Sequence, residues 1–550
     1  MGSKLPAPGS FSPRRAGWLA FALVLAAIAL SLSLACDHFQ PGLDSDVLWP
    51  QVFAHDLGDA RHPVSGWVFG AAPFWFPDFT LFLPLKWLGG DSGLNYPLFA
   101  VAVFLLIGAT MAWSLAASGI ERAPAVIWGF LALDAVLLLQ FLPGHGGWLW
   151  QLAIPANHGA QLTVGFALLA LVLGAVRAGK WARSRFMISL MLMALGLASD
   201  NVLLGQWVGP LFLALLGQSL RSPGPRRVLN GFVLQAVAAI AFAVGLRIFL
   251  IKQEWFFFSS LLLYSPTPAN IWRCFSHFGE SFFADGMFAQ NWLLWLLAAA
   301  AIGAAWRGLR KSGTGEVEPL QRFVLTFGLL SLLAAWALPI VTVYWVNPHS
   351  IRYLSNWVML PAWLLAWRGA TRPQFSAKLP KLAGAVAAAG LVFGLPRISV
   401  DKLFFPQPDA DLQAFCERRH FTQGLADYWH GHLLMAEWRF QGPRLGEIAD
   451  EFFPVFWCNN AFDYFPTAHD GPGLARPAPQ FIILDGLDSK HVMYWLQSNS
   501  LQVAKVGPYQ VAVLTPEQSR LAGERLAAQT ETLLKGRRAD WLAAQLFPPH

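Results

Sequence analysis

Apolar segments of about twenty residues recur along this chain from Gly17 to about Pro396 and then stop. The hydrocarbon core of a bilayer is about 30 Å thick, and roughly 20 mostly apolar residues cross it as a helix. Because backbone polar groups find no water in that core, such segments become helical there. The composition agrees, with 55% hydrophobic residues, 13% charged residues and a mean hydropathy of +0.45. The sequence therefore predicts an all-α polytopic membrane protein.

We predict about eleven transmembrane helices, each centred on one apolar segment. They cover residues 17–36, 97–117, 123–142, 159–176, 186–199, 202–219, 228–251, 291–306, 323–346, 353–368 and 382–396. Asp200-Asn201 separates the fifth segment from the sixth. We interpret this polar pair as a tight external turn, and an intramembrane polar site is the alternative.

The distribution of Lys and Arg predicts the orientation. With the N-terminus inside, nineteen basic residues flank the cytoplasmic ends of the spans and five lie on the short outer loops. The nineteen are Lys4, Arg14, Arg15, Arg122, Arg177, Lys180, Arg183, Arg185, Arg221, Arg226, Arg227, Arg307, Arg310, Lys311, Arg322, Arg368, Arg372, Lys378 and Lys381; the five are Arg61, Lys86, Lys252, Arg273 and Arg352. By the positive-inside rule, the N-terminus is cytoplasmic and the tail after residue 397 is outside. We expect the membrane to be a bacterial inner (cytoplasmic) membrane. The net charge of +7 reflects mostly these anchors, so nucleic acid is not expected as a partner.

The chain divides into two predicted parts. Residues 1–396 form a transmembrane module with a large first outer loop at 37–96, and residues 397–550 form a soluble extracytoplasmic domain. In this tail the apolar runs 481–484 and 511–514 alternate with turns, which is typical of strands, and 521–542 has helical periodicity. We therefore expect an α+β domain. Cys416 and Cys458 both fall in it, on the side where disulfides persist, and a bridge and two free buried thiols are equally open.

The first outer loop is longer than a connection requires, and long loops in compact proteins are often functional. Its candidate residues are Asp44 and Asp46, which follow the first span closely, and His55 and Asp78. Ordinary solvated acids are the alternative. The apolar run 79–88 is too short to span, and we expect it to form an interfacial helix, with Trp75 and Trp87 near the headgroups.

Two further outer loops carry candidate binding residues. The second is rich in Gly and Trp around His145, a composition suited to stacking on a sugar ring or to an interfacial turn. The loop before the tenth span contains Arg352 and Tyr353. A guanidinium offers a planar fork of donors that suits phosphate oxygens, whereas snorkelling to lipid headgroups is the simpler explanation. No metal-ligand spacing such as C-x-x-C occurs, so no cofactor is predicted and a divalent metal is not indicated.

These features together resemble the GT-C glycosyltransferases, most closely the branch of protein O-mannosyltransferases and the lipid A aminoarabinose transferase. The resemblance lies in the inside N-terminus, the acids after the first span, the run Phe76-Pro77-Asp78-Phe79, the late Arg352-Tyr353 followed by Pro361, and the outer C-terminal domain. It implies that Asp46, with Asp44 second, is the base or the group that orients the acceptor, and that Arg352 holds the phosphate of a polyprenyl-phosphate sugar. The chain departs from the family where Ser45 splits the usual acidic pair and where Phe-Pro-Asp-Phe replaces a basic run.

The expected function is transfer of a sugar from a polyprenyl-phosphate donor to a lipid, glycan or protein acceptor on the extracytoplasmic side. Asp78, His55, His145, Arg352 and Tyr353 are the expected substrate contacts. A transporter or flippase for a lipid-linked or envelope substrate is the alternative, and Asp134, Asp200 and Arg247 are its candidate intramembrane charges. A non-catalytic envelope scaffold is the third alternative.

Overall fold

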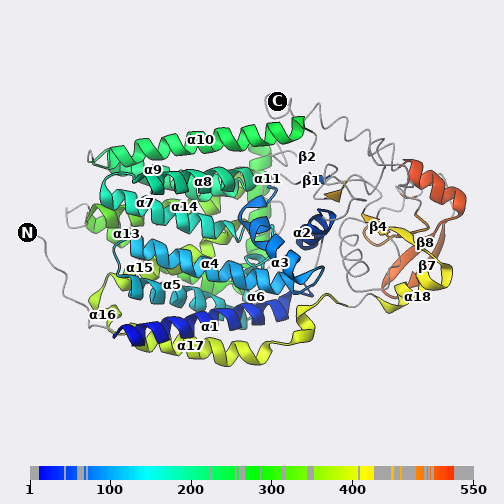
Figure 1. Cartoon of the computed structure of the whole chain (residues 1–550), viewed down its shortest axis with the longest axis horizontal. Coiled ribbons are helices and arrows are strands. Elements are labelled where there is room, and N and C mark those ends of the chain that lie inside the picture. Colours follow the sequence, from blue (N-terminus) through cyan, green and yellow to red (C-terminus); the bar gives the residue numbers. More distant parts are fainter. Residues whose placement is uncertain are drawn as a thin grey trace, which may run out of the picture.

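The computed structural model describes residues 12–41, 45–57, 67–69, 72–221, 224–253, 257–258, 267–284, 287–312, 318–342, 352–406, 409–426, 447–450, 459–460, 479–487, 492, 496 and 501–525. Long helices run side by side in one bundle (Figure 1). The first of them, α1 (Pro13–His38), begins at the end of the bundle opposite the C-terminal sheet (Figure 1). It starts four residues before the predicted span, because Ser12 accepts a hydrogen bond from the Arg15 N–H and Pro13 occupies the first helical position.

Each predicted span contains a helix. In chain order these are α1, α4 (Asn95–Ala117), α5 (Arg122–Leu137), α7 (Gln161–Ala178), α8 (Arg183–Ser199), α9 (Gly209–Ser219), α10 (Gly224–Lys252), α13 (Trp292–Ser312), α14 (Pro319–Val341), α15 (Ser355–Ala370) and α17 (Leu379–Gly394). A 3-10 turn (η3, Leu138–Phe141) extends α5, and a π-helical turn (η4, Leu204–Val208) precedes α9. Within the described part of the chain, 8 helices are long and apolar enough to cross a membrane, while α8, α9 and α15 are shorter. A mostly helical, multi-pass architecture is thus confirmed, and the number of spans stays a prediction.

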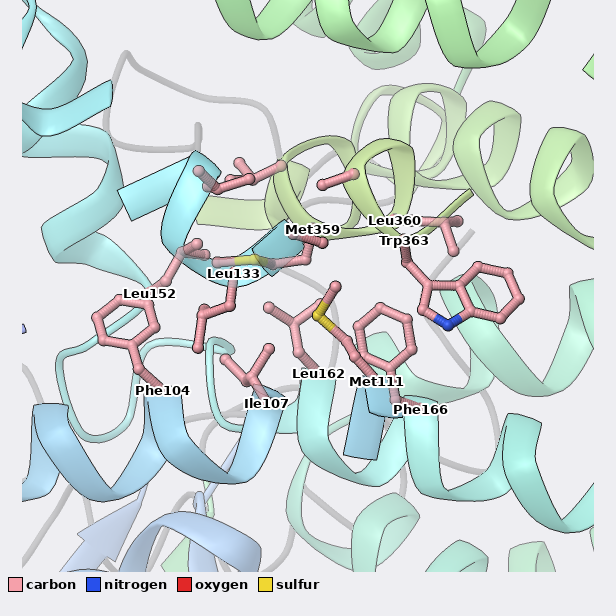
Figure 2. Packing of buried hydrophobic residues seen from close by; sticks show 14 of the residues in the cluster. Phe104, Ile107, Met111, Leu133, Leu152, Leu162, Phe166, Met359, Leu360 and Trp363 are labelled. Carbon is pink, nitrogen blue, oxygen red and sulfur yellow. The ribbon is translucent and has the colours of Figure 1, made fainter. Parts of the chain in front are cut away.

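Large apolar side chains from four helices form the centre of the bundle. Figure 2 shows Ile107 and Met111 of α4 among Leu133 of α5, Leu162 of α7 and Trp363 of α15. All five side chains are almost completely buried. Since lipid tails are as apolar as these side chains, helix association in a membrane depends on close packing rather than on a hydrophobic driving force.

Short helices gather mainly at one end of the bundle. Those between the long helices are α2 (Ser45–Asp56), η2 (Trp75–Phe79), α3 (Thr80–Gly89), α6 (His145–Gln151), α11 (Pro268–Gly279), η5 (Glu280–Ala284), α12 (Met287–Gln290) and α16 (Pro373–Ser376). In Figure 1, α2, α3 and α11 lie at the end that faces the C-terminal sheet, and α16 lies at the other. The helix predicted at 79–88 is α3, and its Trp87 and Leu88 are 74% and 88% exposed, as an interfacial helix requires.

The C-terminal region after α17 contains a five-stranded mixed sheet. Two 3-10 turns, η7 (Leu395–Arg397) and η8 (Val400–Leu403), lead to α18 (Ala410–Arg419). The strands are β3 (Gln423–Ala426), β4 (Glu447–Asp450), β6 (Phe481–Ile483), β7 (Gln502–Val506) and β8 (Tyr509–Val513), in the order β4-β3-β6-β8-β7. Strand β3 is parallel to β4 and β6, and β8 is antiparallel to β6 and β7. Strands β6 and β8 confirm the two predicted at 481–484 and 511–514.

Helices cover both faces of this sheet. Leu412, Phe415 and Cys416 of α18 pack on one face. The other face is covered by residues that include Val492, Leu496 and Ala522, the last in the helix at 516–525. Cys416 is a free, fully buried thiol, and burial raises its pKa to about 12. Cys458, its proposed bridging partner, lies outside the described residues.

A second, three-stranded sheet joins segments that are far apart in the sequence. Strand β1 (Trp67–Phe69) of the first loop pairs in parallel with β2 (Phe257–Phe258) and antiparallel with β5 (Asn459–Asn460). The side-chain amide of Gln40 also donates to the backbone oxygens of Asp401 and Phe404. The first loop, the loop after α10 and the C-terminal region therefore share one side of the bundle, in agreement with the charge-based grouping of the loops.

Candidate functional site

Asp78 is a buried carboxyl group at the loop end of the bundle. It lies in η2, is 1% exposed, and accepts a hydrogen bond from the Ala156 N–H at 2.9 Å through Oδ1. Its Oδ2 is also buried and has no partner among the described residues. Burial raises the pKa of Asp78 to about 7, and the negative charge of Asp200 acts in the same direction. The hydrogen bond from the Ala156 N–H acts against them and lowers this pKa. A carboxyl group with this pKa can exchange a proton near neutral pH.

Three hydrogen bonds fix the segment that carries Asp78 onto the ends of α7 and α8. The Phe74 N–H donates to the backbone oxygen of Ser199 at 3.2 Å, and the Phe76 N–H donates to the Ser199 Oγ at 2.8 Å. The side-chain amide of Gln161 donates to the Phe76 carbonyl at 2.8 Å. Phe74 itself has a left-handed backbone conformation, with φ 54°. A first-loop segment is thus anchored to two long helices far along the chain.

His158 and Asp200 form a buried pair beside this segment. The His158 Nδ1 lies 2.7 Å from Oδ2 of Asp200, and the side chains are 6% and 1% exposed. Asp200 ends α8, and its Oδ1 accepts the Val202 N–H at 2.9 Å. The expected turn at Asp200-Asn201 is present, because α8 ends there, but Asp200 points inward and Asn201 is exposed.

The loop that supplies Ala156 and His158 is held in an unfavourable conformation. Both residues have positive φ, 66° and 64°, which residues with a Cβ adopt at a cost. Such strain persists where surrounding contacts hold the backbone in place, and it is concentrated at functional sites. Here the Asp78 and Asp200 carboxyl groups are the contacts that hold this loop.

Tyr353, in the loop before α15, lies beside His158. Its ring centroid is 4.9 Å from that of His158, and the Phe74 ring centroid is 5.0 Å from that of His158. The guanidinium carbon of Arg352 lies 5.5 Å from the centre of the Tyr353 ring. The Gln206 side chain donates to the Tyr353 carbonyl at 2.6 Å, and this contact connects the loop to η4. We call Asp78, His158, Asp200, Tyr353 and Arg352 the loop-end cluster.

The loop-end cluster contains acids, a histidine and an arginine, and so provides groups that can exchange protons and bind an anion. Of the predicted site residues, it unites Asp78, Arg352 and Tyr353. Within the part of the chain that the structure describes, no group of three His, Cys, Asp or Glu side chains is arranged to hold a metal ion.

Two of the predicted histidines have other surroundings. His55 lies 3.0 Å from Asp91, which also binds Lys86 at 2.7 Å. Burial would raise the pKa of Asp91, but hydrogen bonds and charges from His55 and Lys86 outweigh it and lower this pKa. His145 is buried at the start of α6, where its Nδ1 lies 2.9 Å from the Pro143 carbonyl oxygen and its Nε2 has no partner among the described residues.

The acids chosen first from the sequence are described only in part. Asp44 lies outside the described residues, and for Asp46 only the backbone is described, as the second residue of α2. The sequence-based choice of site residues did not include His158, and it named Asp200 only as a candidate charge of the transporter alternative. The available signals were a polar pair interrupting a long apolar run and a histidine closing the Gly- and Trp-rich loop.

Comparison with known proteins adds no assignment. No model of a known protein family matches the chain, and no curated protein is similar to it in sequence. The geometry of the loop-end cluster is therefore the basis on which a function is proposed.

Proposed function

We propose that this protein transfers a sugar from a polyprenyl-phosphate donor to an envelope acceptor at the extracytoplasmic face of the bacterial inner membrane. The observation that carries the proposal is the loop-end cluster: Asp78, whose pKa is raised to about 7, holds the loop that carries His158, and His158 contacts Asp200 and the Tyr353 ring, which lies beside Arg352. Its members come from the first loop, the second loop, the turn after α8 and the loop before α15, at the end of a bundle of apolar helices. In this proposal all eleven helices cross the membrane with GT-C-like topology.

The proposed roles follow from the chemistry of the side chains. Arg352 binds the donor phosphate, because a guanidinium fork matches phosphate oxygens and remains charged. Asp46, with Asp44 as the second choice, orients the acceptor hydroxyl group. The polyprenyl phosphate is a good leaving group, so transfer requires alignment of the two substrates and stabilisation of the departing charge. The donor reaches the site by lateral diffusion in the bilayer.

Mass spectrometry of envelope glycans and lipids in a deletion strain tests the proposal. The expected result is loss of one sugar modification, restored by the wild-type gene. In the same strain, Arg352→Lys restores it poorly, because Lys keeps the charge and loses the bidentate fork. Arg185→Lys is the matched control, since Arg185 is an exposed anchor in α8. An unchanged glycan and lipid profile in the deletion strain would contradict the proposed function.

Transport is the second candidate, and one observation favours it. Asp134, in the last turn of α5, is fully buried, and neither carboxyl oxygen has a hydrogen-bond partner among the described residues. Intramembrane acids often mark a substrate or ion pathway. Loss of function in Asp134→Asn together with full function in Arg352→Lys would favour transport over transfer.

A further inference from the structure

The pair formed by His158 and Asp200 has the arrangement of a carboxylate that orients an imidazole. The pair is buried, with Nδ1 and Oδ2 2.7 Å apart. The remaining oxygen of Asp200 is fixed by the Val202 N–H, so the carboxyl group is held from both sides. The His158 ring also contacts the rings of Phe74 and Tyr353, at centroid distances of 5.0 and 4.9 Å. Position and orientation of this imidazole are thus determined by three different segments.

This contact decides which nitrogen of His158 is available. When Asp200 is ionised, Nδ1 carries the hydrogen that it donates to the carboxylate. The neutral ring then has its lone pair on Nε2, for which the described residues provide no hydrogen bond. An imidazole held in this tautomer by a carboxylate accepts a proton at Nε2, and the carboxylate stabilises the imidazolium that results.

We propose that His158, oriented by Asp200, accepts the proton of the acceptor hydroxyl group during sugar transfer. This inference rests on the proposed function and adds to it a residue that the sequence reading did not assign. The acceptor oxygen forms a bond to the anomeric carbon, and its proton moves to Nε2 of His158. The bond between the anomeric carbon and the phosphate oxygen breaks, and its electron pair leaves with the polyprenyl phosphate. The imidazolium then returns its proton to water.

The surroundings of His158 agree with this role. The Tyr353 ring contacts both His158 and Arg352, the residue that holds the donor phosphate in the proposed function. Asp200 acts through His158 and is a positioning residue. Asp78, whose Oδ1 holds the Ala156 N–H, fixes the loop two residues before His158.

The test compares His158→Gln and Asp200→Asn with a matched control. Gln keeps a polar side chain and cannot take the proton, and Asn keeps an acceptor oxygen without the charge. His277→Gln is the control, because His277 also pairs with a carboxylate, Glu280 at 3.2 Å, but its side chain is 39% exposed. Two quantities are measured for each variant: the sugar modification restored in the deletion strain, and the thermal stabilisation of the purified full-length protein by undecaprenyl phosphate.

With His158 as proton acceptor, His158→Gln lowers transfer by about 10² to 10⁴-fold, Asp200→Asn lowers it by a smaller factor, and both still bind undecaprenyl phosphate. His277→Gln retains both properties. Full transfer by His158→Gln overturns the inference and leaves the proposed function standing. Loss of both transfer and phosphate binding in His158→Gln assigns the pair a structural role, which also overturns it. A deletion strain with unchanged glycans and lipids overturns the proposed function together with this inference.

Discussion

At the scale of single residues, Asp78 shows how burial turns a loop acid into a group that titrates near neutrality. Its pKa is raised to about 7 mainly by burial, and one oxygen has no partner among the described residues. Because the pKa of the folded state lies above the unfolded value of 3.8, the native state holds the proton more tightly. Asp78 therefore costs stability as the pH rises through the interval between these values, by up to about 1.4 kcal/mol per pH unit.

The loss of stability that Asp78 causes as the pH rises leads to a testable prediction. Between pH 5 and pH 8 the melting temperature of the purified protein falls less in Asp78→Asn than in the wild type, since the uncharged amide does not titrate. Differential scanning fluorimetry in detergent measures both slopes. Asp411→Asn, at an exposed position of α18, keeps the wild-type slope. Equal slopes for Asp78→Asn and the wild type would show that Asp78 is ionised throughout this range.

Asp134 provides a second prediction at the residue scale. Burying a polar group without a hydrogen bond costs about 1 to 3 kcal/mol of stability. Both carboxyl oxygens of Asp134 are buried and have no hydrogen-bond partner among the described residues. Asp134→Val is therefore expected to raise the melting temperature. Asp91→Asn has the opposite effect, because Asp91 binds His55 and Lys86. A lower melting temperature for Asp134→Val would mean that the carboxyl group makes a stabilising contact.

At the scale of elements, glycines set how closely the long helices approach. A Cβ added at Gly129 of α5 would lie 2.8 Å from the backbone nitrogen of Ala112 in α4, closer than real Cβ atoms come. A Cβ at Gly303 of α13 would have no atom within 4 Å. Close backbone contact through small residues is a characteristic means of helix association in membranes.

The two glycines therefore respond in opposite directions to the same substitution. Gly129→Ala forces α4 and α5 apart and lowers stability by about 1 to 3 kcal/mol, the usual cost of overpacking. Gly303→Ala raises stability by up to about 1 kcal/mol, because alanine restricts the unfolded chain. Melting temperatures in detergent compare the two. If Gly129→Ala is neutral, α4 and α5 do not pack at this contact.

At the scale of the whole molecule, the two ends of the bundle carry different groups of loops. One end combines the first loop, the loop after α10 and the C-terminal region through β1, β2 and β5. The other combines the ends of later helices, where the Trp181 side chain donates to the Val228 carbonyl at 2.9 Å and the Gln218 side chain donates to the Pro319 carbonyl. The charge rule predicts that the second group is cytoplasmic.

Cysteine labelling in intact cells tests this orientation. Lys505→Cys in β7 is expected to react with a membrane-impermeant maleimide, and Arg221→Cys, after α9, only once the cells are lysed; both positions are exposed. The native Cys416 is an internal control, because it is fully buried with a pKa of about 12 and reacts with neither treatment. Labelling of Arg221→Cys before Lys505→Cys would reverse the predicted topology and the location of the site.

Much of the fold follows from the sequence alone, because membrane spans are a local property. Twenty consecutive apolar residues need a helix wherever they lie, so a helix occurs at each predicted segment. The strands at 481–484 and 511–514 were predictable for a similar reason, since their apolar runs are bounded by turns. Asp78 could be selected because it lies in the long first loop, and Arg352, with its neighbour Tyr353, because it is one of five basic residues on the short outer loops.

The partners of these residues were decided only by the tertiary structure. Asp78 lies 78 positions from Ala156, His158 lies 42 positions from Asp200, and β1 pairs with β2 and β5 from distant loops. Hydropathy places each helix approximately along the chain, but it does not determine which helices become neighbours around the bundle. That order depends on how glycines and large side chains fit together, and these contacts join residues with no local relation in the sequence. For this reason the sequence determined a bundle with its polar residues at the loop ends, and only helix packing placed His158 against Asp200.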